Sequence, residues 1–189
     1  MTLVRTVEPS AEPVTLAELK AFLRIDHGSE DTLLQGLIRA ARQDVERATG
    51  LALIDQAWRL VVDAVPKSGW LTLPLHPLRE ILSVTAYGAE GAAVLIDPAS
   101  YRADLISRPG RLFFDPRPER LKAMNGVEVD FTAGFGEAGT DVPDTLRHAI
   151  KLLAGHWYEF RGAYGPADQP VSYPGGYERL IAGYRARRL

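Results

Sequence analysis

The fold is decided by residues 127–160, which read VEVDFTAGFGEAGTDVPDTLRHAIKLLAGHWYEF. Val127, Val129 and Phe131 alternate with polar residues, and this spacing predicts a strand that buries one face. The glycine-rich stretch 133–139 ends the β region, and Pro143 suits the first turn of a helix. Apolar residues then recur at helical spacing and predict a buried stripe, formed by Leu146, Ala149, Ile150, Leu153, Trp157 and Phe160. Together with the strand-rich middle and the helical segments described below, this strand and helix indicate an α+β protein.

Two further helices are predicted near the N-terminus. Thr15 and Glu18 have the spacing of a capping box and predict a helix over residues 15–24. A second helix is expected over residues 30–49, where apolar residues again follow helical spacing and Gly50 suits the position after the helix end. The other face of this second helix carries mixed charges, and such a face is usually solvated surface: Arg39, Arg42, Asp44, Glu46 and Arg47.

The middle of the chain, residues 57–133, is predicted to be β-rich. Short β-prone runs alternate there with turns that contain proline, as expected when proline is kept out of central strands. We expect antiparallel strands joined by loops of several residues. The runs cover residues 58–62, 70–73, 81–87, 94–96, 101–103, 111–114 and 127–132.

Length and composition fit one domain with an appendage. The chain has 189 residues, 46% hydrophobic residues and no cysteine, so disulfides and thiolate chemistry are excluded. We expect a domain over residues 1–162, with a third helix at about 143–161, and a linker and C-terminal tail over residues 163–189. No apolar run approaches the roughly 20 residues that a membrane span needs, so no membrane contact is expected. A net charge of −2 gives no overall attraction to nucleic acid.

No catalytic, cofactor-binding or metal-binding residues are identified. The four histidines do not have the spacing of a metalloprotease helix, and Gly134-Phe135-Gly136 lacks the third glycine of a dinucleotide-binding loop. Carboxylates such as Asp97, Asp104 or Asp115 could still form an acid–base pair in space, although Asp-Pro pairs are ordinary turn sequences. We therefore expect a protein that is not an enzyme and has no cofactor, and we keep a small enzyme with an unrecognised carboxylate site as an alternative.

The C-terminal tail combines apolar, tyrosine and arginine residues, which are enriched at protein interfaces. Its short helix is too brief to be stable alone, which indicates that it docks on something. A partner is favoured, and folding back on the chain's own domain is the alternative. Nucleic-acid binding is a third possibility, through Arg179, Arg185, Arg187 and Arg188. The candidate docking residues are Tyr177, Leu180, Ile181, Tyr184 and Arg185.

Several segments, in order, resemble phage head-tail connector (adaptor) proteins, a group that includes adaptors of gene transfer agents. The resemblance covers about residues 12–162. It is carried by residues 12–20 (EPVTLAELK), 23–26 (LRID), 73–78 (LPLHPL), 131–136 (FTAGFG) and 149–159 (AIKLLAGHWYE).

The resemblance implies a mainly α-helical bundle core with an antiparallel β-rich insertion and a C-terminal tail helix. It also implies a virion structural protein of a tailed phage or a gene transfer agent particle, assembled in the bacterial cytoplasm and placed at the head–tail junction. Copies would form a ring, commonly of twelve, between the portal protein and a tail-side connector or stopper protein. DNA would pass through the ring, and the tail residues named above would dock on the portal.

Overall fold

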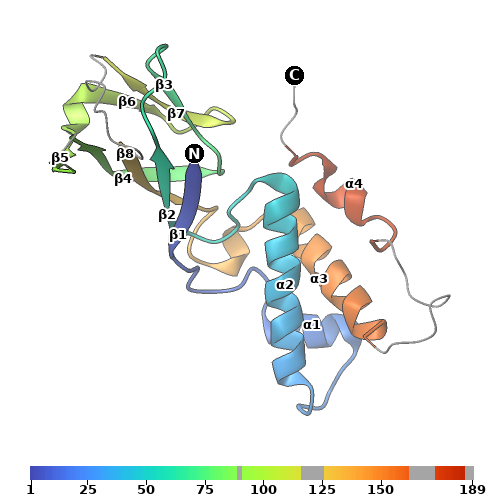
Figure 1. Ribbon diagram of the computed structural model, residues 1–189. Helices are drawn as coiled ribbons and strands as arrows, with labels where there is room; N and C mark the ends of the chain where they lie inside the picture. The colour runs from blue at the N-terminus through green and yellow to red at the C-terminus, as the bar shows by residue number, and fades with distance from the viewer. Residues whose placement is uncertain (89–90, 116–125, 162–172, 186–189) are drawn as a thin grey trace. The chain divides into compact units, whose positions relative to one another are not determined.

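The chain forms two compact units in the computed structural model, which describes residues 1–88, 91–115, 126–161 and 173–185. The β unit consists of Met1–Ser10 and Asp55–Phe135, and the α unit consists of Ala11–Ile54 and Gly136–Leu189 (Figure 1). The chain therefore passes between the units three times. Most of the expected linker, residues 162–172, and the last arginines, Arg187 and Arg188, lie outside the described residues.

Five strands of the β unit form an antiparallel sheet in the order β1-β2-β8-β4-β5. The central strand β8 is hydrogen-bonded to β2 and to β4, and its residues alternate between buried and partly exposed, as the sequence predicts. The buried side of β8 adds Val129 and Phe131 to the core of this unit. The strands span Thr2–Val7 (β1), Gln56–Val62 (β2), Leu78–Tyr87 (β4), Ala93–Leu95 (β5) and Val127–Ala133 (β8).

Three strands form a second antiparallel sheet, in the order β3-β7-β6. They span Trp70–Leu73 (β3), Tyr101–Asp104 (β6) and Gly110–Phe114 (β7), and a 3-10 turn, Pro98–Ser100 (η1), precedes β6. Leu71, Leu73 and Leu112 bury one face of this sheet. The two sheets approach closely where a Cβ added to Gly110 would lie 2.1 Å from Cδ1 of Leu78. Glycine at position 110 therefore leaves room for the Leu78 side chain.

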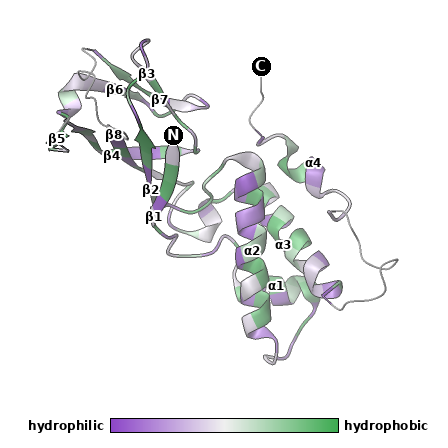
Figure 2. Cartoon of the chain, viewed as in Figure 1, coloured by the Kyte–Doolittle hydropathy of each residue, from purple (hydrophilic) through white to green (hydrophobic). Residues whose placement is uncertain are grey.

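The α unit contains four helices in the described residues, α1 (Leu16–Leu23), α2 (Asp31–Thr49), α3 (Asp144–Glu159) and α4 (Tyr177–Ala182), and a 3-10 turn, Gly139–Asp141 (η2). Helices α2 and α3 pack against each other, and Figure 2 shows apolar residues on α3 beside α2. None of the described helices is long and apolar enough to cross a membrane. The core side chains are at most 2% exposed and come mainly from Leu19, Leu34, Ile38, Ala41, Val45, Leu146, Ala149, Ile150 and Leu153.

The predicted capping box is present at the start of α1. The backbone N–H of Glu18 donates to Oγ1 of Thr15 at 3.2 Å, and the backbone N–H of Thr15 donates to Oε2 of Glu18 at 2.8 Å. These two bonds satisfy donors that the first turn of a helix leaves without a partner. At the end of α2, Gly50 adopts the expected left-handed conformation, with φ of 72°.

Three details differ from the sequence-based expectations. Phe160 is 48% exposed because α3 ends at Glu159. Trp157 is only partly buried. Strand β1 was not predicted, because it lies at the edge of its sheet and neither of its faces is fully buried. An edge strand of this kind lacks the strong alternation that reveals a half-buried strand.

Candidate docking interface and its supporting contacts

The C-terminal helix α4 packs on α3 and α2 within the α unit. Gly176 precedes it in a left-handed conformation, with φ of 91°. Of the candidate docking residues, Tyr177 and Ile181 are fully buried in this arrangement. The structure therefore shows the tail helix folded back on its own unit, and these two side chains are not available at the surface of this arrangement.

Asp44 of α2 binds the segment that leads into α4. The hydroxyl of Tyr177 donates to Oδ2 of Asp44 at 2.8 Å, and the hydroxyl of Tyr173 donates to Oδ1 at 3.2 Å. The two tyrosine rings are stacked, with centroids 4.9 Å apart, and Arg47 forms an ion pair with the same carboxylate. Burial, together with the bond to Asp44, raises the pKa of Tyr177, so its hydroxyl remains a proton donor at neutral pH.

The other three candidate residues reach the surface. Leu180 and Tyr184 are partly exposed, and Arg185 is exposed. Arg185, which follows α4, forms an ion pair with Glu178 in the first turn of that helix at 2.6 Å. The structure thus divides the predicted set into two buried residues that hold α4 in place and three residues that can meet a partner without unfolding the helix.

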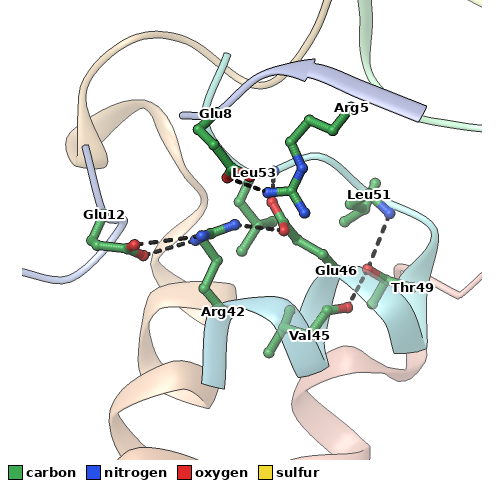
Figure 3. Close-up of polar contacts among 9 residues, drawn as sticks. All are labelled: Arg5, Glu8, Glu12, Arg42, Val45, Glu46, Thr49, Leu51 and Leu53. Atoms are coloured by element: carbon green, nitrogen blue, oxygen red, sulfur yellow. Dashed lines mark hydrogen bonds and ion pairs between the residues drawn. The ribbon is translucent and has the colours of Figure 1, made fainter. Parts of the chain in front are cut away.

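A buried arginine joins the segment through which the chain enters the α unit before α1 and the segment through which it leaves after α2. Arg42 is 1% exposed; its Nε donates to Oε2 of Glu12 at 2.8 Å, and its Nη1 donates to Oε2 of Glu46 at 2.8 Å (Figure 3). The second oxygen of Glu46 accepts the backbone N–H of Leu53 at 3.0 Å. Burial acts to lower the pKa of Arg42, but the carboxylates of Glu46 and Glu12 outweigh it and raise the pKa.

The remaining connection to the β unit is bound to the same region of the α unit. Nε of Arg147 in α3 donates to the carbonyl oxygen of Pro13 at 3.1 Å, and Arg147 also forms an ion pair with Glu18. A Cβ added to Gly139 would lie only 2.9 Å from the carbonyl oxygen of Pro13. The segments around residues 12, 53 and 139, which lead to the three crossings, are therefore held together by α2 and α3.

The charged face expected on residues 30–49 is not simply solvated surface. Arg39 and Arg47 are exposed, but Arg42 and Asp44 are buried and bind other parts of the α unit. The expectation was wrong for these two residues because their charges have partners far away in the sequence. The sequence does indicate the burial of Arg42, because this residue lies four positions after Ile38 and three before Val45, on the buried stripe of the helix.

Two of the acidic residues considered for catalysis, Asp97 and Asp104, have local roles. Oδ1 of Asp97 accepts the backbone N–H of Ala99 at 2.9 Å and caps the turn η1. Asp104 accepts the backbone N–H of Ser107 at 3.0 Å, and hydrogen bonds from Ser107 and Arg111 lower its pKa to about 2. Within residues 1–88, 91–115, 126–161 and 173–185, no group of three potential ligands is arranged to hold a metal ion.

Comparison with known proteins gives one family and a set of similar structures. Residues 13–89 match the model of the phage gp6-like head-tail connector proteins. Over these residues the chain is similar to the phage gp6-like head-tail connector family. The segment runs from the start of the α unit through α1, α2 and the first strands of the β unit that follow them. The comparison with curated protein sequences gives no match.

Similar solved structures extend the likeness over the full length of the chain. They are chains from the neck of an empty GTA particle (TM-score 0.85), from the virion of a native GTA particle (0.81) and from the neck of a native GTA particle (0.78). Each is 28% identical, and each alignment covers 100% of this chain and 97% of the other. The expected α+β fold and the expected structural, non-enzymatic class of protein are both confirmed by these relatives.

Proposed function

We propose that this protein is a structural adaptor that joins the head and the tail of a tailed phage or gene transfer agent particle. The observation that carries the proposal is the full-length match to a chain of a GTA particle neck, at 28% identity and a TM-score of 0.85. A fold without an evident catalytic group in its described residues suits a protein that acts by assembly.

In this proposal, the copies form a ring, of twelve in the simplest case, between the portal protein and a tail-side connector or stopper protein. Two of the similar structures are necks computed with sixfold and twelvefold rotational symmetry, which supports a ring. DNA passes through the ring, and the particle is assembled in the bacterial cytoplasm. The division into an adaptor domain, residues 1–162, and a tail, residues 163–189, belongs to the same proposal.

The tail docks on the portal in this proposal, and the structure suggests a role for each of the five candidate residues. Tyr177 and Ile181 position α4 from inside the α unit. Leu180 on the accessible side of α4, together with Tyr184 and Arg185 just after the helix, provides the contact. The folded-back helix and a docking helix are thus compatible, because a packed helix can present its outer face to a partner.

Deletion of the gene in a particle-producing strain tests the proposal. Electron microscopy is expected to show DNA-filled heads separate from free tails, and an intact copy of the gene should restore joined particles. Normally tailed particles from the deletion strain would exclude the adaptor role. A matched copy that encodes Arg39→Lys, an exposed and conservative change, controls for expression from the complementing gene.

A further inference from the structure

The outer face of the three-stranded sheet carries aromatic and arginine residues. Trp70 and Phe113 are directly opposite each other on β3 and β7, and Arg102 of β6 is opposite Phe113. Residues that are opposite in an antiparallel pair point to the same side of the sheet. Arg111 lies two residues from Phe113 on the same side of β7. We call Trp70, Arg102, Arg111 and Phe113 the arginine–aromatic face.

These four side chains lie against one another in a continuous row. The rings of Trp70 and Phe113 have centroids 4.8 Å apart. The guanidinium carbon of Arg111 lies 4.4 Å from the ring centroid of Trp70, and that of Arg102 lies 5.0 Å from the ring centroid of Phe113. Trp70 is nevertheless 40% exposed. Trp and Arg are the residue types that most often dominate the free energy of protein interfaces, and here they gather on the solvent side of a small sheet.

The position of the two arginines over the rings determines which atoms of the arginine–aromatic face can contact a partner. An arginine already lies over each ring, so neither ring has both faces free for a nucleic-acid base. The guanidinium groups instead present their N–H edges, which bind carboxylates or phosphates. Asp104 already binds Arg111, with its Oδ2 3.1 Å from Nε, whereas Arg102 has no carboxylate partner among the described residues. One unneutralised arginine is too little for a phosphate backbone, which needs several such contacts, so a carboxylate-bearing protein surface fits better.

The geometry points to a second copy of this chain as the occupant, and this inference rests on the proposed ring. A ring repeats one contact between two unlike surfaces of each copy, so an exposed basic face needs an acidic counterpart elsewhere on the same chain. The chain has a net charge of −2, and exposed carboxylates lie near one another in the sequence before and at the start of α3, at Glu137, Asp141 and Asp144. Asp144 also forms an ion pair with Arg147 at 3.0 Å within its own chain, so Glu137 and Asp141 are the main candidates. We propose that the arginine–aromatic face packs against carboxylates of the neighbouring copy in the ring.

Photo-crosslinking in purified particles tests this contact. The photoreactive amino acid p-benzoylphenylalanine is placed at Thr72, which is exposed and lies opposite Arg111, so that the arginine–aromatic face itself stays intact. Irradiation is expected to give a product of twice the 20.8 kDa chain mass, with peptides of a second copy at the crosslink. The same probe at Leu82 of β4, which is 51% exposed on the other sheet, is expected to give at least fivefold less of this product.

Charge reversal gives the second readout. Arg102→Glu is expected to lower the yield from Thr72 at least fivefold, whereas Arg24→Glu, at an exposed arginine of the α unit, should leave it unchanged. Circular dichroism of each purified variant verifies that it is folded. If the chain is present in particles but the product contains another protein, or no product forms, the inference is wrong and the adaptor role stands. If the chain is absent from particles, both are wrong.

Discussion

The hydroxyl of Tyr177 lies 2.8 Å from Oδ2 of Asp44, although 133 positions separate the two residues in the sequence. This bond fixes the C-terminal helix to α2 and gives the buried carboxylate a donor. A buried charged group is stable only when hydrogen bonds replace the water that it has lost. The buried carboxylate of Asp44 therefore needs the hydroxyl of Tyr177 as a donor, and the same bond holds the C-terminal helix on α2.

Removal of the Tyr177 hydroxyl should destabilise the α unit. Tyr177→Phe leaves the ring in place and takes one donor from a buried carboxylate, so we expect a loss of about 1.5–3 kcal/mol in the free energy of unfolding. Tyr173→Phe is the matched control, because Tyr173 is 47% exposed and its bond to Asp44 is longer, at 3.2 Å. Urea denaturation followed by circular dichroism measures both variants. If both variants lost the same free energy of unfolding, the burial of Tyr177 would not make its bond to Asp44 more important than that of Tyr173.

Loss of the buried arginine should cost more. Arg42→Met gives an uncharged side chain of similar length and leaves Glu12 and Glu46 without their cation, so we expect a loss of about 3–5 kcal/mol. Arg39→Met on the exposed side of the same helix should change stability by no more than about 0.5 kcal/mol. Thermal unfolding of the two variants separates a buried network from a surface charge. Similar melting temperatures would show that Arg42 contributes little.

Part of this molecule could be predicted from its sequence and part could not, for identifiable reasons. Strand β8 was predicted because a central strand with one buried face must alternate, and the start of α1 because Thr15 and Glu18 form a local motif. Tyr177 and Ile181 were singled out as docking residues, but no local pattern shows that their binding surface lies on the chain itself. The partner of Asp44 is fixed by tertiary packing, so position in the sequence could not reveal it.

Glycines distinguish crowded positions from open ones. A Cβ at Gly134 would lie 2.4 Å from the backbone nitrogen of Asp55, so Gly134→Ala should force the backbone to shift and cost about 1–3 kcal/mol. Gly36, in the middle of α2, has no atom within 4 Å of the same position, and Gly36→Ala should stabilise the helix by about 0.5–1 kcal/mol. Melting temperatures should therefore move in opposite directions. If both melting temperatures shifted in the same direction, the surroundings described for Gly134 or for Gly36 would be wrong.

The polar ladder on β2, β4 and β8 should make stability depend on pH in acid. Arg59 donates to both oxygens of Asp130, at 2.8 and 2.9 Å, and Ser83 donates to Oδ2; these bonds, chiefly from Arg59, hold the pKa of Asp130 below its usual value of 3.8. The unfolded chain therefore takes up this proton first as the pH falls. The stabilisation is complete above the unfolded value and is lost as the pH falls through the folded pKa.

Urea midpoints measured between roughly pH 5 and pH 3 test this dependence. The midpoint of the unchanged protein should fall with pH, and the fall should be shallower for Asp130→Asn, which has no proton to gain. Asp26→Asn, at an exposed carboxylate, is the control and should follow the unchanged protein. Burial lowers the pKa of His76, so its effect on stability begins as the pH falls below the usual histidine value of 6.5, which is above the range of this experiment. If the urea midpoints of Asp130→Asn and Asp26→Asn fell equally with pH, the bonds to Asp130 would not be the source of the pH dependence.

The tail offers the sharpest distinction between support of the fold and contact with a partner. Leu180 is partly exposed and Ile181 is fully buried, although they are neighbours on α4. Leu180→Asp should leave the far-ultraviolet circular dichroism spectrum and the melting temperature nearly unchanged, yet lower the fraction of joined particles in the complementation experiment. Ile181→Asp buries a charge without a partner, so it should lower the melting temperature before any assembly is measured. If Leu180→Asp destabilises the free chain as strongly as Ile181→Asp, the outer side of α4 also supports the fold. If the protein with Leu180→Asp is stable and joins heads to tails normally, the portal contact lies elsewhere.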